Sequence, residues 1–457
     1  MTHIDPAALQ AIVGAAADEH GCPPIAWGVV VDGEVVAGQL TDRVRRIASM
    51  TKSFTAAAVL ALRDEGLLSL DVPVAEYAPE LAPVRGPDRS PAISLRHLLS
   101  MSSGLATDDP WADRHLDMSP TDIDRVYADG PLFARPTGSG FEYSNLGYGM
   151  IGRVVERATG TRLQQHVTDR FLRPLGMHDT TWVEPAADRW DPPFRRQDDA
   201  TVPDPHHPIG DGEISPMGGL WTTVDDLARW TSFLDGEAPP VGTLSTASRR
   251  EMASMHTWVG MITIAGRAGP AGYGFGLRQF VDPELGPLVD HSGGLPGYGS
   301  NMRWAAGRGV AAIALSNLTY APMSELTMQL LVEVHRQGGM PNVLPPAAPL
   351  LNDAAMRLVA LLSAWNDHDA DRLFADNVAP DEHLDRRRRQ AAALVDRHGA
   401  LELVRVEPVT EARGAVVARG AASGEELRIT VMLAPLADGT VQHYSVVDNT
   451  AAPSVDD

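Results

Sequence analysis

The sequence has one cysteine, no long apolar run and fewer basic than acidic residues. Cys22 alone can form neither an internal disulfide nor a cysteine-rich metal site. No apolar stretch approaches the ~20 residues that span a bilayer. Lysine and arginine total 38 against 59 aspartate and glutamate residues, for a net charge of −21. This acidity argues against nucleic acid and anionic membranes as partners.

The N-terminus also lacks the basic segment and apolar core of a secretory signal. We therefore expect a cytoplasmic protein. In other respects the composition is that of an ordinary globular chain, with 44% hydrophobic and 21% charged residues. A length of 457 residues suggests two or three domains.

A proline-rich segment, 341–349, predicts a linker between two domains. Before it, residues 1–340 carry strand-like runs at both ends and helical patterns between them. This order predicts an α/β domain, an antiparallel sheet flanked by helices, with a helical lobe. After the linker, residues 350–457 predict helices followed by a small sheet. We expect a compact α+β accessory domain that resembles lipocalin-like or nuclear-transport-factor-like modules.

Periodicity and turn residues predict individual elements. A hairpin is indicated where two apolar runs flank Asp32-Gly33. Residues 184–216, rich in proline and aspartate, predict a long surface excursion. A pair of helices is expected over 146–172, and the other expected helices are 7–20, 95–100, 225–234, 322–337, 352–373 and 381–398. The other expected strands are 273–277, 288–291, 300–304, 310–315, 401–408, 413–419, 426–434 and 440–447.

Ser49 and Lys52 open an alanine-rich stretch that predicts a helix running to Glu65 and ending at Gly66. Residues three apart share a face of a helical turn. A serine hydroxyl becomes a nucleophile when a nearby base takes its proton, and a lysine with a lowered pKa can act as that base. Because S-x-x-K also arises by chance, a catalytic reading needs further parts.

Two later motifs supply candidates for those parts. Tyr143 and Asn145 lie in a glycine-rich loop, where the tyrosine can carry a proton and the asparagine can contact a substrate carbonyl and Lys52. His291 and Gly293 end an apolar strand, and glycine there lets a substrate lie against the strand edge. Taken alone, each motif is more simply a half-buried loop tyrosine or a strand-ending turn.

The three motifs together resemble the serine β-lactamase and penicillin-binding-protein-like superfamily of S-x-x-K acyl-serine enzymes. The sequence is most similar to the branch of class C β-lactamases, esterases and D-aminopeptidases. The likeness covers roughly residues 7–335. It includes further phrases typical of the family at 95–99, 174–177 and 218–223.

The resemblance implies that Ser49 is the acylated nucleophile and that Lys52 and Tyr143 share the proton transfers. Asn145 would orient Lys52 and bind the substrate amide. The resemblance also implies a β-lactamase-like fold and no cofactor.

The strand motif completes the implied site. His291 and Gly293 would bind substrate, and the backbone N–H groups of Ser49 and Gly294 would form the oxyanion hole. His291 stands where β-lactamases and cell-wall transpeptidases usually carry lysine. Histidine lacks that permanent charge, which helps to hold a substrate carboxylate, so the pattern is closer to esterases, D-amino-acid amidases and peptide-cyclising members.

Other polar clusters do not predict sites. Adjacent His206 and His207 in a proline-rich loop rarely share one metal ion. The segment 367–371 lacks the glycine and glutamate of a calcium loop. We therefore expect no metal. The basic run 386–389 predicts a solvated helix face, and Arg428 is more simply a surface residue than a substrate contact.

We expect an acyl-enzyme formed on Ser49 from an ester, thioester or amide, with a small-molecule or peptide substrate. A hydrolase of small esters or D-configured peptides is one form. A second is a stand-alone cyclase that releases a carrier-bound nonribosomal peptide thioester as a macrolactam, similar to the penicillin-binding-protein-type thioesterases. A third is a catalytically inactive binding protein of the same fold. The oligomeric state is left open.

Overall fold

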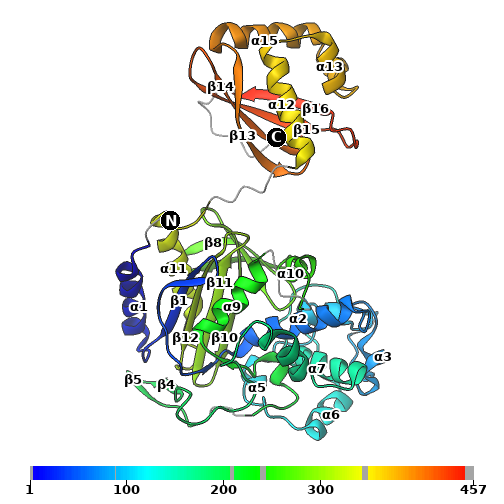
Figure 1. Ribbon diagram of the computed structural model, residues 1–457. Coiled ribbons are helices and arrows are strands. Elements are labelled where there is room, and N and C mark those ends of the chain that lie inside the picture. The colour runs from blue at the N-terminus through cyan, green and yellow to red at the C-terminus, as the bar shows by residue number, and fades with distance from the viewer. Residues whose placement is uncertain (1–3, 88, 206–209, 237–242, 342–347, 448–457) are drawn as a thin grey trace. The chain divides into compact units, whose positions relative to one another are not determined.

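The computed structural model describes residues 4–87, 89–205, 210–236, 243–341 and 348–447 (Figure 1). The chain divides into two compact units, Met1–Pro341 and Asn342–Asp457. Most of the expected linker, and with it residues 342–347, lies outside the described residues, while Pro349 is the first residue of a helix. The His206-His207 pair also lies outside them.

The first unit is built on an eight-stranded antiparallel sheet in the order β2-β1-β12-β11-β10-β9-β8-β7. The N-terminal hairpin pairs with the last strand of the unit, β1 with β12, so the two ends of the unit meet in the sheet. The bounds are β1 Ala26–Val31, β2 Glu34–Gln39, β7 Thr257–Ile264, β8 Arg267–Tyr273, β9 Arg278–Asp282, β10 Gly286–Leu295, β11 Tyr298–Ala305 and β12 Val310–Ser316.

Helices cover both faces of this sheet (Figure 1). Helices α1 (Pro6–His20) and α11 (Met323–Arg336) pack with one apolar cluster, and α9 (Val224–Asp235) with the other. The helical lobe holds α2 Thr51–Asp64, α3 Val74–Tyr77, α4 Leu95–Leu99, α5 Asp109–Ala112, α6 Pro120–Asp129, α7 Asn145–Thr159, α8 Leu163–Val167 and α10 Thr246–Met252. Among the described helices, none has the length and apolarity needed to cross a membrane.

Local sequence signals account for the helix ends. The Asp5 side chain accepts a hydrogen bond from the Ala7 N–H at the start of α1, and Gly21 ends it with φ of 61°. Thr223 caps α9 through the Asp226 N–H. Ser144 caps α7, which carries Asn145 in its first turn. The predicted helices at these positions are therefore confirmed, and one of the caps sits beside a predicted site residue.

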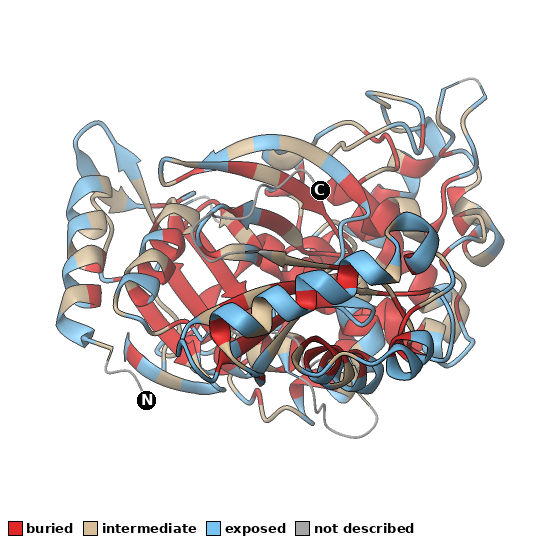
Figure 2. Cartoon of the chain, turned by 90° about the horizontal axis from the view of Figure 1, so that it is seen from above, coloured by how far each residue is buried: buried red, intermediate tan, exposed pale blue. Residues whose placement is uncertain are grey.

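Buried residues are concentrated in the central strands of the large sheet and in α2, while other helices expose one face to solvent (Figure 2). All residues of β11 and β12 are buried, as expected for central strands covered by helices on both sides. The predicted hairpin around Asp32-Gly33 and the predicted strands 288–291, 300–304 and 310–315 are confirmed by β1, β2, β10, β11 and β12.

The predicted strand 273–277 is wrong, because β8 ends at Tyr273 and the next four residues turn. Gly276 has φ of 68°, and a Cβ there would lie 2.4 Å from the Lys52 carbonyl oxygen. The turn therefore packs directly on α2. The predicted excursion 184–216 contains a short hairpin, β4 Phe194–Gln197 with β5 Ala200–Pro203. A two-residue strand, β3 (Arg45–Arg46), pairs with β6 (Trp221–Thr222) just before Ser49.

The second unit contains a four-stranded antiparallel meander in the order β13-β14-β15-β16. The predicted helix 352–373 is divided in two, since Asn366 caps a new helix. Arg428 pairs with Glu407. The bounds are α12 Pro349–Ser363, α13 Asp367–Leu373, α14 Val378–Asp381, α15 Leu384–His398, β13 Leu401–Thr410, β14 Arg413–Gly420, β15 Glu426–Leu433 and β16 Val441–Val447. Its likeness to lipocalin-like or nuclear-transport-factor-like modules stays a prediction.

Candidate active site

Ser49 lies in a tight 3₁₀ turn, Ala48–Met50, that leads directly into α2. The preceding residue, Ala48, has φ of 49°, a left-handed conformation that is unfavourable for a residue with a side chain. The chain therefore bends sharply where β3 gives way to the turn. Ser49 is 8% exposed, so its hydroxyl is shielded by the protein but lines a cavity.

Lys52 is fully buried, and its Nζ contacts three acceptors from separate parts of the chain. It lies 2.8 Å from Ser49 Oγ, 2.7 Å from Asn145 Oδ1 and 3.0 Å from the Met217 carbonyl oxygen. A lysine ammonium has three N–H donors, so each hydrogen has a partner. The structure thus brings together Ser49, Lys52 and Asn145.

Two of the three acceptors fix where the lysine lone pair points. The Met217 carbonyl oxygen and Asn145 Oδ1 can both accept hydrogen bonds, and neither can donate one. The Asn145 amide is itself oriented, because its Nδ2 donates to Asp109 Oδ1 at 2.6 Å. When Lys52 is neutral, these two acceptors hold its two hydrogens. The lone pair then faces Ser49 Oγ, which is the geometry of a base beside its nucleophile.

Burial lowers the pKa of Lys52 to about 8, while the nearby carboxylates of Asp109, Asp113 and Asp108 oppose this shift. At neutral pH, roughly one lysine in ten is then a free amine. Burial also raises the pKa of Asp113 to about 7, although Tyr320 donates a hydrogen bond to its carboxylate at 2.8 Å. The electrostatic setting of Lys52 therefore changes within the physiological pH range.

Tyr143 places its ring 4.9 Å from Lys52 Nζ, measured to the ring centroid. Burial, with Tyr273 and Asp109 nearby, raises the pKa of Tyr143 well above its usual value, and a hydrogen bond with Ser49 opposes that rise. Tyr143 is therefore a neutral phenol at physiological pH. It can relay or donate a proton, but it does not serve as a resting phenolate.

Both ring nitrogens of His291 are already in hydrogen bonds. Nδ1 lies 2.6 Å from the Ser292 carbonyl oxygen, which only accepts, so Nδ1 carries the proton. Nε2 must then accept from the Tyr273 hydroxyl, 2.9 Å away. Burial, helped by Lys52 and Arg278, lowers the pKa of His291 to about 3. The residue lines the cavity as a neutral ring.

Gly293 and Gly294 line the same cavity of about 530 Å³ as Ser49, Tyr143 and His291. A Cβ on Gly293 would lie 2.0 Å from the Ile47 carbonyl oxygen, so glycine is required for β10 to approach the Ser49 turn. Beyond Asp290, the described pairing of β9 with β10 has ended. The edge of β10 beside Ser49 is therefore open to a substrate.

The sequence reasoning missed the residues that hold this arrangement. Asp108 accepts the backbone N–H groups of Asn145 and Leu146 at 2.7 and 2.8 Å and so fixes the start of α7. Asp109 orients the Asn145 amide. Both residues lie in a segment that was predicted only to be a loop. Two adjacent aspartates before a proline do not indicate that their side chains bind Asn145 and Leu146.

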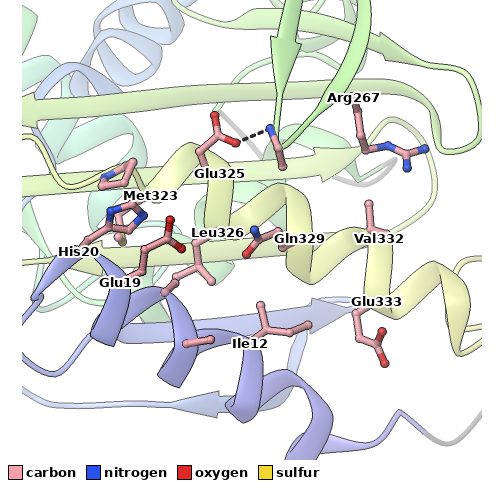
Figure 3. Close-up of a pocket in the computed structure, with 14 residues that line it drawn as sticks. Ile12, Glu19, His20, Arg267, Met323, Glu325, Leu326, Gln329, Val332 and Glu333 are labelled. Carbon is pink, nitrogen blue, oxygen red and sulfur yellow. Dashed lines mark hydrogen bonds between the residues drawn. The ribbon is translucent and has the colours of Figure 1, made fainter.

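A second cavity, of about 440 Å³, lies between α1 and α11 (Figure 3). The Ala265 N–H donates to Glu325 at its rim. None of the predicted site residues lines it. Within the described part of the chain, no group of three metal-ligating side chains was found.

A serine paired with a buried lysine at the edge of an antiparallel sheet defines a β-lactamase-like serine hydrolase. The family model named Beta-lactamase matches residues 9–335. The chain is 31% identical over 336 residues to esterase EstB of Burkholderia gladioli, covering 65% of this chain and 82% of that protein. It is also 31% identical over 365 residues to penicillin-binding protein 4 of Amycolatopsis lactamdurans, covering 74% and 92%. The chain therefore belongs to the beta-lactamase family.

Solved structures agree on the fold. A penicillin-binding protein homologue from Pyrococcus abyssi, described as octameric, has a TM-score of 0.63 at 20% identity, covering 97% of this chain and 100% of that one. A D-stereospecific amidohydrolase from Streptomyces sp. has a TM-score of 0.57 at 23% identity, covering 72% and 98%. At these identities the likeness shows the fold alone. It confirms the expected β-lactamase-like architecture.

Proposed function

We propose that the protein is a serine hydrolase that forms an acyl-enzyme on Ser49 from small esters, thioesters or amides, including D-configured peptides. The observation that carries this proposal is the 2.8 Å contact between Lys52 Nζ and Ser49 Oγ, with the other two lysine contacts made to obligate acceptors. The esterase among the relatives supports esters as a substrate class.

In the proposed reaction, the Ser49 hydroxyl transfers its proton to neutral Lys52 as Oγ bonds to the acyl carbon. The backbone N–H groups of Ser49 and Gly294 hold the oxyanion. The tetrahedral intermediate then breaks its bond to the leaving group, which takes a proton relayed through the neutral Tyr143 hydroxyl. Water attacks the acyl carbon in a second cycle and restores Ser49.

Labelling with a fluorophosphonate probe tests this proposal. We expect stable modification of Ser49, located by peptide mass spectrometry, and turnover of p-nitrophenyl esters. Ser49→Ala should abolish both. A wild-type protein that neither labels nor turns over these esters would contradict the proposal and favour the inactive binding protein of the same fold.

Peptide cyclisation is a narrower form of the same chemistry, in which an amine replaces water as acyl acceptor. Offering a linear peptide thioester with D-residues distinguishes the two. Mass spectrometry reports loss of the thiol with water added for hydrolysis, or without it for a macrolactam. Formation of the linear acid alone would exclude cyclisation of that substrate. A cytoplasmic location also stays a prediction of the sequence.

A further inference from the structure

The open edge of β10 is short. Strand β9 leaves β10 after Asp290, so the open edge begins at His291. Tyr320 marks its other end, because the tyrosine ring lies against Gly294. A Cβ at Gly294 would be 2.7 Å from Tyr320 Cδ1. Since a strand advances about 3.4 Å per residue, the edge from His291 to Gly294 is about 10 Å long and holds about three residues of an extended chain.

Two paired glycines let the segment of Tyr320 lie close to the sheet. Gly294 in β10 pairs with Gly299 in β11, so a side chain at either position would point to the same face. The Tyr320 ring lies beside the first glycine. The backbone of Ala321 lies beside the second, where a Cβ would be 2.5 Å from the Ala321 carbonyl oxygen. A side chain at either glycine would displace this segment from the sheet.

Tyr320 is fixed through both its backbone and its hydroxyl. Its φ of 51° is unfavourable for a residue with a side chain, and its N–H donates to the Tyr298 carbonyl oxygen at 3.1 Å. The hydroxyl donates to Asp113 Oδ2 at 2.8 Å. Burial and the nearby Asp113 raise the pKa of Tyr320, so the hydroxyl keeps the proton that it donates.

The contact between Tyr320 and Asp113 joins two sides of the catalytic cavity. Tyr320 belongs to the segment between β12 and α11, whereas Asp113 directly follows α5 in the helical lobe, 207 residues away in sequence. Both residues line the cavity with Ser49. The open edge of β10 therefore ends at a wall that is supported from the sheet and from the lobe.

The proposed reaction fixes which part of a substrate would meet this wall. Tyr143 relays the proton to the leaving group, and its ring centroid lies 6.5 Å from that of His291. The leaving group is then at the His291 end of the edge. With its carbonyl carbon at Ser49 and its oxyanion at the Gly294 N–H, the acyl group extends in the opposite direction, toward Tyr320.

We propose that Tyr320 is a specificity-determining residue that limits the length of the acyl group along the edge of β10. An acyl group of one residue fits between Ser49 and the tyrosine ring, whereas a longer peptidyl chain meets the ring. Asp113 is a positioning residue, because it acts through the Tyr320 hydroxyl. The inference rests on the proposed acyl-enzyme chemistry and narrows its substrates to short acyl donors.

Two thioesters of the same neutral thiol test this. One carries an N-acetylglycyl group and the other an N-acetyltriglycyl group, and glycine removes any effect of configuration. The readout is the ratio of kcat/KM for the short over the long thioester, measured by thiol release. A change in the pKa of Lys52 cancels in this ratio, because both thioesters have the same scissile group. We expect a wild-type ratio of about ten, the size of a steric mismatch in a binding pocket.

Tyr320→Gly should bring the ratio close to one, because it removes the ring and accepts a φ of 51° without strain. Tyr320→Phe keeps the ring but loses the contact with Asp113, and it should lower the ratio about threefold. Trp258→Ala is the matched control. It removes an aromatic side chain that is 55% exposed, against 51% for Tyr320, and that lies outside the described lining of the cavity. The control should keep the wild-type ratio.

Three results would overturn the length limit while leaving the acyl-enzyme in place. They are equal kcat/KM for the two thioesters in the wild type, a ratio that survives Tyr320→Gly, and labelling of Ser49 without thiol release from either thioester. If Tyr320→Gly does not fold, the wild-type ratio and Tyr320→Phe decide the question. Absence of thiol release together with absence of fluorophosphonate labelling at Ser49 would instead overturn the proposed function, and the length limit would fall with it.

Discussion

Asp109 and Asn145 are joined by a 2.6 Å hydrogen bond from the amide Nδ2 to the carboxylate Oδ1. This contact decides which end of the Asn145 amide faces Lys52. With Oδ1 turned toward the lysine, the free amine of Lys52 presents its lone pair to Ser49. In the proposed mechanism, Asp109 therefore positions the base, Lys52, through Asn145.

Substituting Asp109 separates its two effects. Asp109→Asn keeps an acceptor for Asn145 but removes a charge that raises the pKa of Lys52. We expect near-normal maximal acylation, with the pH midpoint moved downward. Asp109→Ala also releases the amide, and we expect acylation to fall about 100-fold. Stopped-flow measurement of the acylation rate as a function of pH gives both the maximal rate and the pH midpoint of each variant. Equal rates and midpoints in the two variants would show that the contact does not orient Asn145.

Acylation should depend on the free amine of Lys52. Because burial sets its pKa at about 8, the acylation rate should rise with pH and level off above that value. Asp113→Asn removes a negative charge that favours the ammonium, so the midpoint should move downward. Tyr320→Phe removes the hydroxyl that lowers the pKa of Asp113, so it should move the midpoint in the same direction by a smaller amount. A midpoint that moves upward in Asp113→Asn would contradict this electrostatic account.

His291 should not titrate in the usual range of a histidine. Burial lowers its pKa to about 3, so the ring should be neutral at pH 5 and above. We expect its ring NMR resonances, assigned by loss in His291→Gln, to stay unchanged between about pH 8 and pH 5, against a free imidazole near 6.5. A shift with a midpoint near 6 would show that the Tyr273 contact does not hold the neutral tautomer.

Two glycines should respond oppositely to alanine. Gly293→Ala would place a Cβ 2.0 Å from the Ile47 carbonyl oxygen, so we expect a loss of about 1–3 kcal/mol in the free energy of unfolding. Gly14 lies within α1 with nothing within 4 Å of its Cβ position, and Gly14→Ala should stabilise by about 0.5–1 kcal/mol. Urea unfolding measures both. If Gly293→Ala is as stable as the wild type and Ser49 is labelled normally, glycine is not required for β10 to approach the Ser49 turn.

Elements with strong local signals were predictable from the sequence. The Asp32-Gly33 turn, the run 310–315 and the four C-terminal strands all match the structure. Strands β7, β8 and β9 were missed. Strand β8 contains Gly269, Pro270 and Gly272, residues that normally interrupt strands. A Cβ at Gly269 would lie 2.2 Å from the Val281 carbonyl oxygen, so a long-range approach, invisible in the pattern, selects glycine there.

The sequence by itself predicted that Ser49 and Lys52 lie together, because a spacing of three residues on a helical turn brings two side chains together wherever that turn lies. The order of the motifs along the chain also identified Tyr143, Asn145 and His291 as candidate site residues. Only the tertiary structure decided what state these groups are in. The acceptors of Lys52 come from Asn145 and Met217, far along the chain, and its pKa follows from their packing around it. The protonation state of each site residue depends on its burial and on its distance from groups in remote segments. Neither quantity can be predicted from the local sequence.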